Sequence, residues 1–489
     1  MKVKLLSASL LFIFSGLSHA NDFQANNNSE LLRSIKRAKC GDTIYINNGI
    51  YEDVKFKANK VCSSKRPLSL SATNPGEVSF TGDVNIMISG DYFTLSGISF
   101  VDGNRDYDAD LITVKGKGNR ISNSKFDSFD NSKGIWIKLE GTYSKIDHNS
   151  FSGKKTQGSY INIDIDPSTP SYHSISYNYF TRPLLGGNGG SASRVGHGSM
   201  HDYNARNVFE FNLFDNENGE SEVVSIKSSE NIFRNNTFLN SKGHLSLRQG
   251  KRNVVIDNYF IGSGAPKENG LFVRGEDHLV FNNYFYNMAP SKKTKDFGTI
   301  SFGASSSKFD QKRADRGLNP YHFPKTKNVF LVNNTTVQSK SSSIVIGSQY
   351  SLKDKKNRST LPENIYIINN ILSNAKSAIN IIKENNNNIL DSNYISGMAS
   401  KQSYKGLKKK DITFTQQGRL SLPTKKESFE SASLTDYIKK MNLFESDWNE
   451  YPPLKQRLEN VTNAGFSEIK DAQGKTLAPL TKEDVGVNW

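Results

Sequence analysis

Cysteine is almost absent from this chain of 489 residues, which contains two cysteines and 14 prolines. A scaffold built on disulfides is excluded, because such scaffolds need many cysteines. The low proline content, together with 29 phenylalanines and 20 tyrosines, argues against global disorder. Beyond the first twenty residues no segment is apolar enough to approach a membrane, so a protein with several membrane spans is also excluded.

The N-terminus has the pattern of a secretory signal peptide. Lys2 and Lys4 precede an apolar run over residues 5–17, and a small-x-Ala motif ends at Ala20. The apolar run is too short and wrongly flanked for a transmembrane helix, and no cysteine follows the motif to carry a lipid. We predict a signal peptide over residues 1–20, a secreted or periplasmic mature protein, and no membrane partner.

Cys40 and Cys62 both lie early in the mature chain. In an oxidising compartment they could form one disulfide, which would stabilise the fold by about 3 kcal/mol through loop entropy. Two buried free thiols are the alternative. Neither arrangement contributes to catalysis.

Positive charge exceeds negative charge, with 63 Lys and Arg against 48 Asp and Glu. The predicted signal peptide contains two lysines and no acidic residue, so its removal lowers the formal charge from +15 to about +13. Such a charge favours an anionic partner: nucleic acid, membrane headgroups or an acidic polysaccharide. The chain has no continuous basic helix and no basic motif interleaved with aromatic residues, and it is exported, so nucleic acid is disfavoured.

A short pattern recurs along the chain: an asparagine, one or two further residues, then an aromatic or aliphatic residue. Neighbouring copies are mostly 22 to 36 residues apart, and repeats of this length indicate a solenoid. Between the copies lie short runs rich in β-branched and aromatic residues, such as 253–256 and 328–332, which are typical of strands. The ten asparagines of the pattern are Asn123, Asn149, Asn178, Asn212, Asn236, Asn258, Asn283, Asn334, Asn370 and Asn393.

The repeat predicts an all-β fold, a right-handed parallel β-helix. A coil of about 22 to 25 residues with three short strands is the size of one turn of such a solenoid. We expect each asparagine to sit at a bend in the left-handed backbone conformation and to hydrogen-bond to the next turn, while phenylalanines stack inside. The asparagines are therefore interpreted as structural.

The two ends of the solenoid differ from its middle. Residues 29–38 have the apolar spacing of a short amphipathic helix, which would cap the first turn. Late in the chain the repeat fades, and helix-like stretches follow at 434–443 and 454–461. We predict a β-helix catalytic domain over residues 21–400 and a partly helical C-terminal tail over 401–489 that packs on it.

The widest interval of the repeat, from Asn283 to Asn334, holds a long basic segment. Such an excursion beside a solenoid face either covers a polyanion or is a solvated loop, and the sequence favours neither. Its basic residues are Lys292, Lys293, Lys295, Lys308, Lys312, Arg313 and Arg316.

Three consecutive turns contain polar residues that the repeat does not require. Glu220 and Glu222 are two residues apart and so share one face of a strand. Lys227 and Arg248 are 21 residues apart, close to one turn, so they would lie nearly one above the other at the interstrand distance of about 4.8 Å. With Asn188, the two glutamates offer an oxygen-only site suited to a hard cation, Ca²⁺ above all. Singly such residues are usually solvated; their conjunction on adjacent turns favours a functional site.

These turns resemble polysaccharide lyase family 6, which contains the alginate lyases and chondroitinase B. The matching motifs are Asn-Gly-Gly…Arg-x-Gly (188–196), Gly-Glu-x-Glu-x-x-x-x-Lys-Ser (219–228) and Leu-x-Leu-Arg-x-Gly (245–250). The similarity extends from about Gly41 to Phe285 and is densest over residues 178–285. It implies a parallel β-helix and β-elimination on a uronic-acid polymer.

The resemblance also implies residue roles. Lys227 matches the family's Brønsted base and Arg248 its general acid, and Arg194 matches a substrate-contacting arginine. The matches to the calcium ligands are Asn188, Glu220 and Glu222. A base must be neutral, so the pKa of Lys227 has to lie well below about 10.4, a shift that Arg248 and the metal would favour. Arginine is a poor acid, so Arg248 could act electrostatically while a water or tyrosine supplies the proton.

Several positions depart from the family pattern. Gln249 stands where many relatives have His, and Ser191 where alginate-type members often have an acid. The arginine common in alginate lyases falls at Phe272, and Arg274, two residues later on the same strand face, would replace it. Without the acid, a nearby basic side chain is the alternative to calcium for neutralising the substrate carboxylate. The predicted substrate contacts are Arg194, His244, Gln249 and Arg274.

The sequence therefore predicts a secreted, monomeric lyase that cleaves alginate internally by β-elimination and releases 4,5-unsaturated oligosaccharides, with Ca²⁺ as the expected cofactor. One alternative is a chondroitin or dermatan sulfate lyase on the same fold, which Phe272 slightly favours. The other is a non-catalytic β-helix that binds anionic glycans. A hydrolase on this fold would need two or three clustered aspartates, and no such run is present.

Overall fold

The computed structural model describes residues 20–105, 108–129, 132–291, 297–353, 358–384, 387–399, 403–424, 431–432, 434–440, 452–471, 473–487 and 489. The predicted signal peptide, apart from Ala20, lies outside the described residues, as do Lys292, Lys293 and Lys295 of the basic segment.

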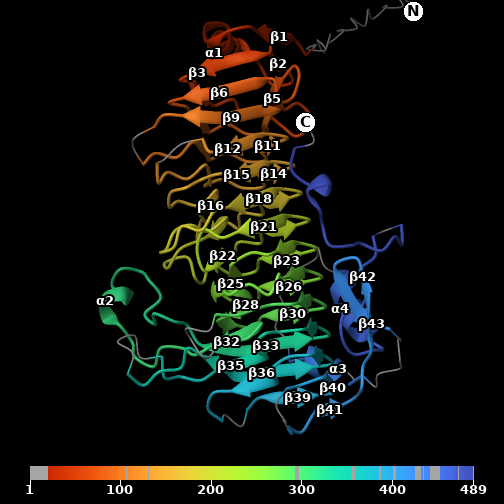
Figure 1. Cartoon of the computed structure of the whole chain (residues 1–489). Helices are drawn as coiled ribbons and strands as arrows, with labels where there is room; N and C mark the ends of the chain where they lie inside the picture. The colour runs from red at the N-terminus through yellow and green to blue at the C-terminus, as the bar shows by residue number, and fades with distance from the viewer. Residues whose placement is uncertain are drawn as a thin grey trace, which may run out of the picture.

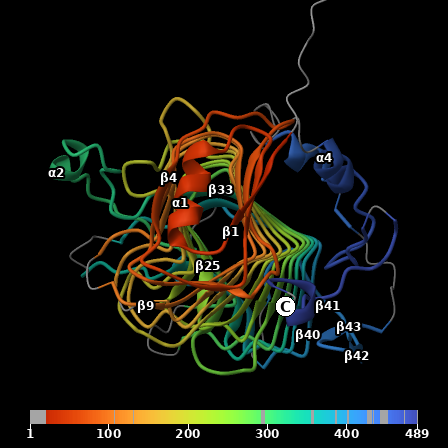
Figure 2. The same cartoon turned by 90° about the horizontal axis from the view of Figure 1, so that it is seen from above.

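The chain winds into a parallel β-helix whose turns stack along one axis (Figure 1). Each turn places one strand in each of three sheets, so hydrogen-bonded neighbours in a sheet are mostly three strands apart in sequence. Figure 2 looks down this axis and shows the superposed turns around a common interior. The predicted all-β parallel solenoid is confirmed.

Over the described residues, the three sheets contain 15, 12 and 14 strands, here called sheets 1, 2 and 3. Sheet 1 consists of β1 (Asp22–Ala25), β2 (Thr43–Ile46), β5 (Leu68–Ala72), β8 (Phe93–Ser96), β11 (Arg120–Ser122), β14 (Lys145–Asp147), β17 (Ser174–Ser176), β20 (Val208–Glu210), β23 (Ile232–Arg234), β26 (Val254–Ile256), β29 (Gly275–Glu276), β30 (Leu279–Phe281), β33 (Thr326–Val332), β36 (Glu363–Ile368) and β39 (Ile389–Asp391). Sheet 2 consists of β4 (Lys55–Ala58), β7 (Asn85–Ile88), β10 (Ile112–Val114), β13 (Ile137–Leu139), β16 (Ile161–Ile163), β19 (Ser193–Val195), β22 (Glu222–Lys227), β25 (Gly243–Gln249), β28 (Glu268–Val273), β32 (Ile300–Gly303), β35 (Ser342–Ser348) and β38 (Ser377–Ile381). Sheet 3 consists of β3 (Gly49–Glu52), β6 (Val78–Gly82), β9 (Ile98–Gly103), β12 (Lys125–Asp127), β15 (Ser150–Ser152), β18 (Tyr179–Arg182), β21 (Leu213–Glu217), β24 (Thr237–Leu239), β27 (Tyr259–Ile261), β31 (Tyr284–Tyr286), β34 (Thr335–Val337), β37 (Ile371–Ser373), β40 (Asn393–Ser396) and β41 (Leu407–Lys409).

The N-terminal cap is the helix α1 (Asn28–Arg37), which lies across the first turn (Figure 2). Its first turn is capped by the Asn27 side chain, which accepts a hydrogen bond from the main-chain N–H of Glu30 at 3.0 Å. Leu31 and Ile35 are buried against the coil. The expected amphipathic capping helix is confirmed.

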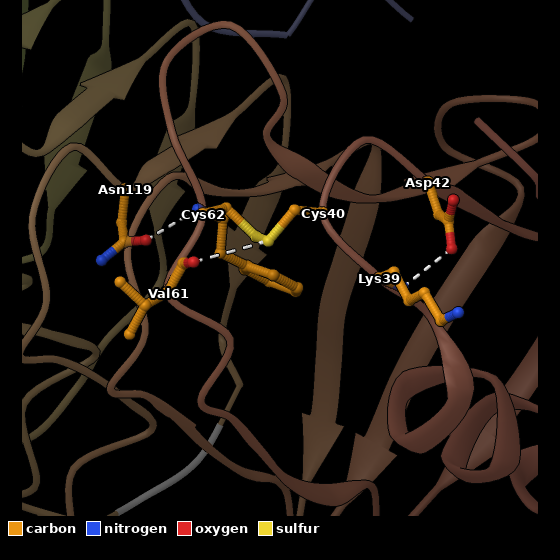
Figure 3. The surroundings of a disulfide bond; sticks show 7 residues. Lys39, Cys40, Asp42, Val61, Cys62 and Asn119 are labelled. Carbon is orange, nitrogen blue, oxygen red and sulfur yellow. Dashed lines mark hydrogen bonds between the residues drawn. A yellow bond between two sulfur atoms is a disulfide. The ribbon is translucent and has the colours of Figure 1, made fainter. Parts of the chain in front are cut away.

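Cys40 and Cys62 form a disulfide that joins the segment after α1 to the segment after β4 (Figure 3). Of the two arrangements left open by the sequence, the structure therefore contains the cross-link. It closes the capped end of the coil, far along the chain from the polar turns.

The asparagine repeat forms a continuous buried ladder. From Asn149 to Asn393, each asparagine donates hydrogen bonds from its main-chain N–H and from Nδ2 to Oδ1 of the next one. Asn123 is an exception, because Ser124 takes the ladder position in that turn and binds Asn149. The prediction that the asparagines are themselves left-handed is confirmed for Asn123 (φ 46°) and wrong for the other nine, where the preceding residue is left-handed, as at Asn235 (φ 54°) before Asn236.

Phenylalanines fill the interior beside this ladder, as expected. Ring centroids of successive turns are 4.5 to 5.0 Å apart, which is the range of stacked aromatic pairs. The stack consists of Phe100, Phe126, Phe151, Phe180, Phe214, Phe238, Phe260 and Phe285.

The C-terminal tail runs back along the coil toward its capped end (Figure 1). It contains β42 (Phe414–Gln417), β43 (Leu420–Pro423), α3 (Thr435–Ile438), α4 (Pro452–Glu459) and the 3-10 helix η2 (Lys482–Asp484). Contacts step from late to early turns: Leu480 N–H donates to Thr237, and the Trp489 indole donates to Asn123 Oδ1 at 3.0 Å. The parallel ladder continues through β41, so the coil extends past the boundary expected at residue 400. The expected helix at 434–443 is described only in part.

The widest interval of the repeat holds a loop with the helix α2 (Gln311–Ala314), which projects beside the coil (Figure 1). Its return segment reaches back to sheet 2, where Phe323 is buried. This excursion is therefore more than a solvated loop.

Candidate active site

The polar turns meet on four consecutive strands of sheet 2: β19, β22, β25 and β28. Along one row of side chains, Arg194 is opposite Ser225, which is opposite Ser246, which is opposite Phe272. The register is irregular between Glu222 and Val224, between Ile226 and Lys227, and between Gly243 and His244. Such bulges redirect side chains and are common beside active sites.

Two adjoining cavities lie over these strands. The first, of about 480 Å³, is lined by Asn188, Arg194 and Lys227 and is called the base cavity. The second, of about 440 Å³, is lined by residues that include His244, Phe272 and Arg274 and is called the arginine cavity. Glu220, Glu222 and Arg248 line both, so the two cavities form one groove.

Eight of the nine predicted site residues line this groove: Asn188, Arg194, Glu220, Glu222, Lys227, His244, Arg248 and Arg274. Gln249 lines neither cavity and is 4% exposed. The bulge before Lys227 places that lysine opposite Gln249, so the predicted stacking of Lys227 directly on Arg248 is off by one residue. Both side chains nevertheless line the base cavity.

Lys227 is a half-buried lysine among charged neighbours. Burial is the largest cause that lowers the pKa of its ammonium below the ordinary value, and the Arg248 and Arg194 guanidiniums lower it further. Glu222 and Glu220 act in the opposite direction, but the net shift is downward. A lysine with a lowered pKa is neutral in a larger fraction of molecules, as a general base requires.

The two groove carboxylates differ in their partners. Glu222 accepts hydrogen bonds from Arg248 Nη1 and, at 2.5 Å, from Ser225 Oγ. Burial alone would raise its pKa, but Arg248 and the other groups around it lower it overall. Burial and the Glu222 charge raise the pKa of Glu220, against a hydrogen bond from Gly189 N–H at 2.9 Å.

The ligand atoms that these residues offer are of the type that a hard cation prefers. Asn188, Glu220 and Glu222 bring only oxygen ligands to one cavity. The repulsion that raises the pKa of Glu220 is of the type that a bound cation relieves. Within the described residues there is no cluster of three or more His, Cys, Asp or Glu able to hold a metal, so the site has two acids and an amide at most.

His244 lines the arginine cavity as a neutral ring. It packs against Phe272 and Phe297, with centroids 5.1 and 6.1 Å away. Burial lowers its pKa to about 4, so the imidazole is uncharged near neutral pH. Its Nδ1 is buried and has no hydrogen-bond partner among the residues that the structure describes.

Among the residues of the arginine cavity that were not anticipated, three come from long segments between strands: Phe323, Gln349 and Arg358. Phe323 enters from the excursion, and the other two come from the segment between β35 and β36. The sequence signal that could have indicated them is the length of these two intervals, since long insertions into a solenoid often build its binding face.

Comparisons with known proteins identify the family of this chain. The family model described as Chondroitinase B matches residues 25–436, most of the chain. The chain belongs to the chondroitinase B family, polysaccharide lyase family 6. The comparison with curated protein sequences found no match to this chain.

Solved structures of family 6 lyases have the same fold as this family member. The alginate lyase AlyGC is 25% identical with a TM-score of 0.77; the match covers 96% of this chain and 59% of that one, so the chain spans less than two thirds of AlyGC. Pedsa3628 from Pseudopedobacter saltans is 23% identical with a TM-score of 0.72, covering 96% and 99% of the two chains. A mannuronic-acid-specific lyase from human gut microbiota is 20% identical with a TM-score of 0.68, covering 80% and 91%.

Proposed function

We propose that this protein is a secreted or periplasmic, monomeric polysaccharide lyase that cleaves alginate by β-elimination. The observation that carries the proposal is Lys227, a half-buried lysine of lowered pKa in the same cavity as Arg194 and Arg248. Membership of polysaccharide lyase family 6 supports the reaction, and the likeness to AlyGC, described as an alginate lyase, supports the substrate. Within the described residues, no helix combines the length and apolar character that a membrane crossing requires.

In the proposed reaction the neutral Lys227 amine removes the C5 proton of a uronate sugar. The C5–H electrons form the C4=C5 double bond, and the C4–O4 bond breaks with its electrons on O4. The product is a 4,5-unsaturated sugar, and the departing O4 takes up a proton. Burial of Lys227 favours its neutral state, because desolvation disfavours the ammonium.

Arg248 would stabilise the charge that develops on O4. Its Nη1 is held by Glu222, which orients the guanidinium toward the shared part of the groove. Among the described residues that line the two cavities there is no tyrosine, which favours a water as the source of the final proton. Arg194, whose Nε donates to Asn162 Oδ1 at 3.2 Å, would contact the substrate carboxylate.

Calcium would be held by Asn188, Glu220 and Glu222. When bound there it would neutralise the substrate carboxylate and so make the C5 proton more acidic. The extent of the groove over four strands offers room for several consecutive sugars, which supports cleavage within the polymer.

The decisive experiment follows ultraviolet absorbance of the unsaturated product. Mannuronate-rich, guluronate-rich and mixed alginates are incubated with the protein, each with calcium and with a chelator. We expect absorbance to rise on at least one alginate; no rise on any of them in either condition would reject the proposal. If the absorbance rises with calcium but not with the chelator, the result would support the calcium site.

Dermatan or chondroitin sulfate is the second candidate substrate, because the matching family model is described as Chondroitinase B and Phe272 lies where alginate lyases often have arginine. Parallel assays on these polymers separate the two. If the protein bound alginate but the absorbance did not change on any of the polymers tested, a non-catalytic glycan-binding protein would be favoured instead.

A further inference from the structure

Arg274 is a buried arginine in the wall of the arginine cavity. It is 2% exposed, and its guanidinium lies between the rings of Phe272 and Phe323, 4.7 and 4.2 Å from their centroids. Its Nε donates to the Ala304 carbonyl at 3.0 Å and its Nη2 to Gln349 Oε1 at 2.7 Å. Within the described residues it forms no ion pair with a carboxylate.

Several other arginines are paired with acids of the coil. Arg206 and Arg252 share Glu230, and Arg457 pairs with Asp257. A buried charge without a counter-ion is unfavourable, so such charges normally occur in pairs. Burial, Arg248 and Arg358 all hold the pKa of Arg274 well below its ordinary value, in keeping with an uncompensated charge.

Gln349 is the residue that orients Arg274. Its Oε1 also accepts a hydrogen bond from Arg358 Nη1 at 2.9 Å, so one neutral amide oxygen bridges two guanidiniums. Gln349 is held at φ 65°, in the left-handed region that is unfavourable for a residue with a side chain. A glutamate in this place would supply the missing negative charge, whereas glutamine positions Arg274 without neutralising it.

The position of Arg274 relates it to the reaction site. Its main-chain N–H donates to the Leu247 carbonyl, so it lies directly after the end of β28, beside the strand that carries Arg248. Lys227 is two strands away, which corresponds to about 10 Å at the usual interstrand spacing. Lys242 and Lys267 line the same cavity, and neither forms an ion pair within the described part of the chain.

We propose that Arg274, oriented by Gln349, binds an anionic group on a sugar other than the one that loses its proton. The group is a carboxylate or a sulfate ester. It would act as the counter-ion of Arg274, for which the described residues supply no carboxylate. The groove would therefore select polymers that carry charge on consecutive sugars. The inference rests on the proposed function only in taking the ligand to be the substrate polymer.

The test is Gln349→Glu, measured as calorimetric binding in a Lys227→Ala background where no turnover occurs. The ligands are an alginate tetrasaccharide, its methyl ester and a dermatan sulfate tetrasaccharide. We expect the Kd of an anionic ligand to rise about 10- to 100-fold, the usual weight of a charge-assisted hydrogen bond. The Kd of the uncharged ester should not rise, which a merely structural defect would not reproduce.

Gln338→Glu is the matched control, because Gln338 is also left-handed (φ 57°) but is exposed and lines neither cavity. Arg274→Gln is a second variant, for use if Gln349→Glu fails to fold. It should weaken binding of the same anionic ligand. Weakened alginate binding assigns a carboxylate. Dermatan sulfate carries both carboxylates and sulfate esters, so weakened binding of dermatan sulfate with unchanged alginate binding assigns a sulfate. Unchanged Kd values for both anions in folded Arg274→Gln would overturn the inference. An inactive wild-type protein would reject the lyase proposal but leave this binding result standing.

Discussion

The asparagine ladder and the groove occupy the same turns of the coil, but they are built in opposite ways. From Asn212 to Asn283 every turn repeats the same asparagine and the same inward phenylalanine. On sheet 2 the corresponding row is not a repeat: it consists of Arg194, Ser225, Ser246 and Phe272, and bulges interrupt the register. Repetition therefore marks what holds the turns together, and departures from it mark the candidate chemistry.

Polar groups are treated differently in the two regions. In the ladder each asparagine donates to Oδ1 of the next asparagine, and its Nδ2 also donates to a main-chain carbonyl of the preceding turn, so the buried amides are satisfied. In the groove, His244 Nδ1 has no partner and Arg274 has no acid among the described residues. A ligand can form the hydrogen bonds and ion pairs that these groove groups lack, whereas the ladder amides already have their hydrogen-bond partners. Substitutions in the two regions should therefore affect different measurements.

The largest effect is expected for Lys227→Ala. Loss of a general base should lower kcat about 10²- to 10⁴-fold, while the unfolding temperature stays the same because the side chain makes no ladder contact. Absorbance kinetics and thermal unfolding measure the two quantities. Lys138→Ala is the matched control on sheet 2, where the lysine pairs with Glu140 and lines neither cavity. Equal losses in both variants would contradict the assignment.

Removal of the disulfide should have the next largest effect, and only on stability. The double variant Cys40→Ser, Cys62→Ser frees the capped end of the coil. The free energy of unfolding should fall by about 3 kcal/mol, from the added entropy of the unfolded chain. Denaturant unfolding measures this, and kcat measured in parallel should not change. A large fall in kcat at full folding would show that the cap and the groove are coupled.

A smaller loss of stability is expected for Asn236→Ala in the ladder. The substitution leaves the Asn212 donors and the Phe209 carbonyl without their partner. The free energy of unfolding should fall by about 2 kcal/mol, as expected for unpaired buried groups. Asn463→Ala, at a partly exposed asparagine of the tail outside the ladder, is the control and should have little effect. If Asn236→Ala lowered kcat instead of stability, the division between ladder and groove would be wrong.

The pH dependence should be the mildest effect. Lys227 is inactive when protonated, so kcat/KM should rise about tenfold per pH unit and level off above the pKa of Lys227. Arg194 lowers that pKa, so in Arg194→Gln the pKa should increase and the rising limb should move to higher pH. The position of the limb, rather than the absolute rate, is the quantity to compare. A limb that moved to lower pH would contradict the electrostatic account.

Much of the fold was predictable because each turn contacts its neighbours through residues that recur in sequence. The ladder, the phenylalanine stack and the capping helix all follow from such local repetition. Asn123 was misplaced because asparagine also suits the left-handed position one residue earlier, and spacing alone does not separate the two roles.

The groove was predictable where its residues lie on, or a few residues before, consecutive strands of the repeat. Glu222 and Arg248 come from neighbouring turns and do meet, although the bulge before Lys227 shifts the expected pairing by one residue. Gln349 and Phe323 arrive from long segments between strands, whose path no repeat encodes. The contacts that orient Arg274 could therefore be found only in three dimensions.

The most direct test of the account is a crystal structure of Lys227→Ala with a bound alginate oligosaccharide. The account predicts sugars along both cavities, with C5 of one uronate facing position 227, O4 facing Arg248 and a second carboxylate at Arg274. An oligosaccharide bound away from sheet 2, or with C5 turned away from position 227, would contradict it.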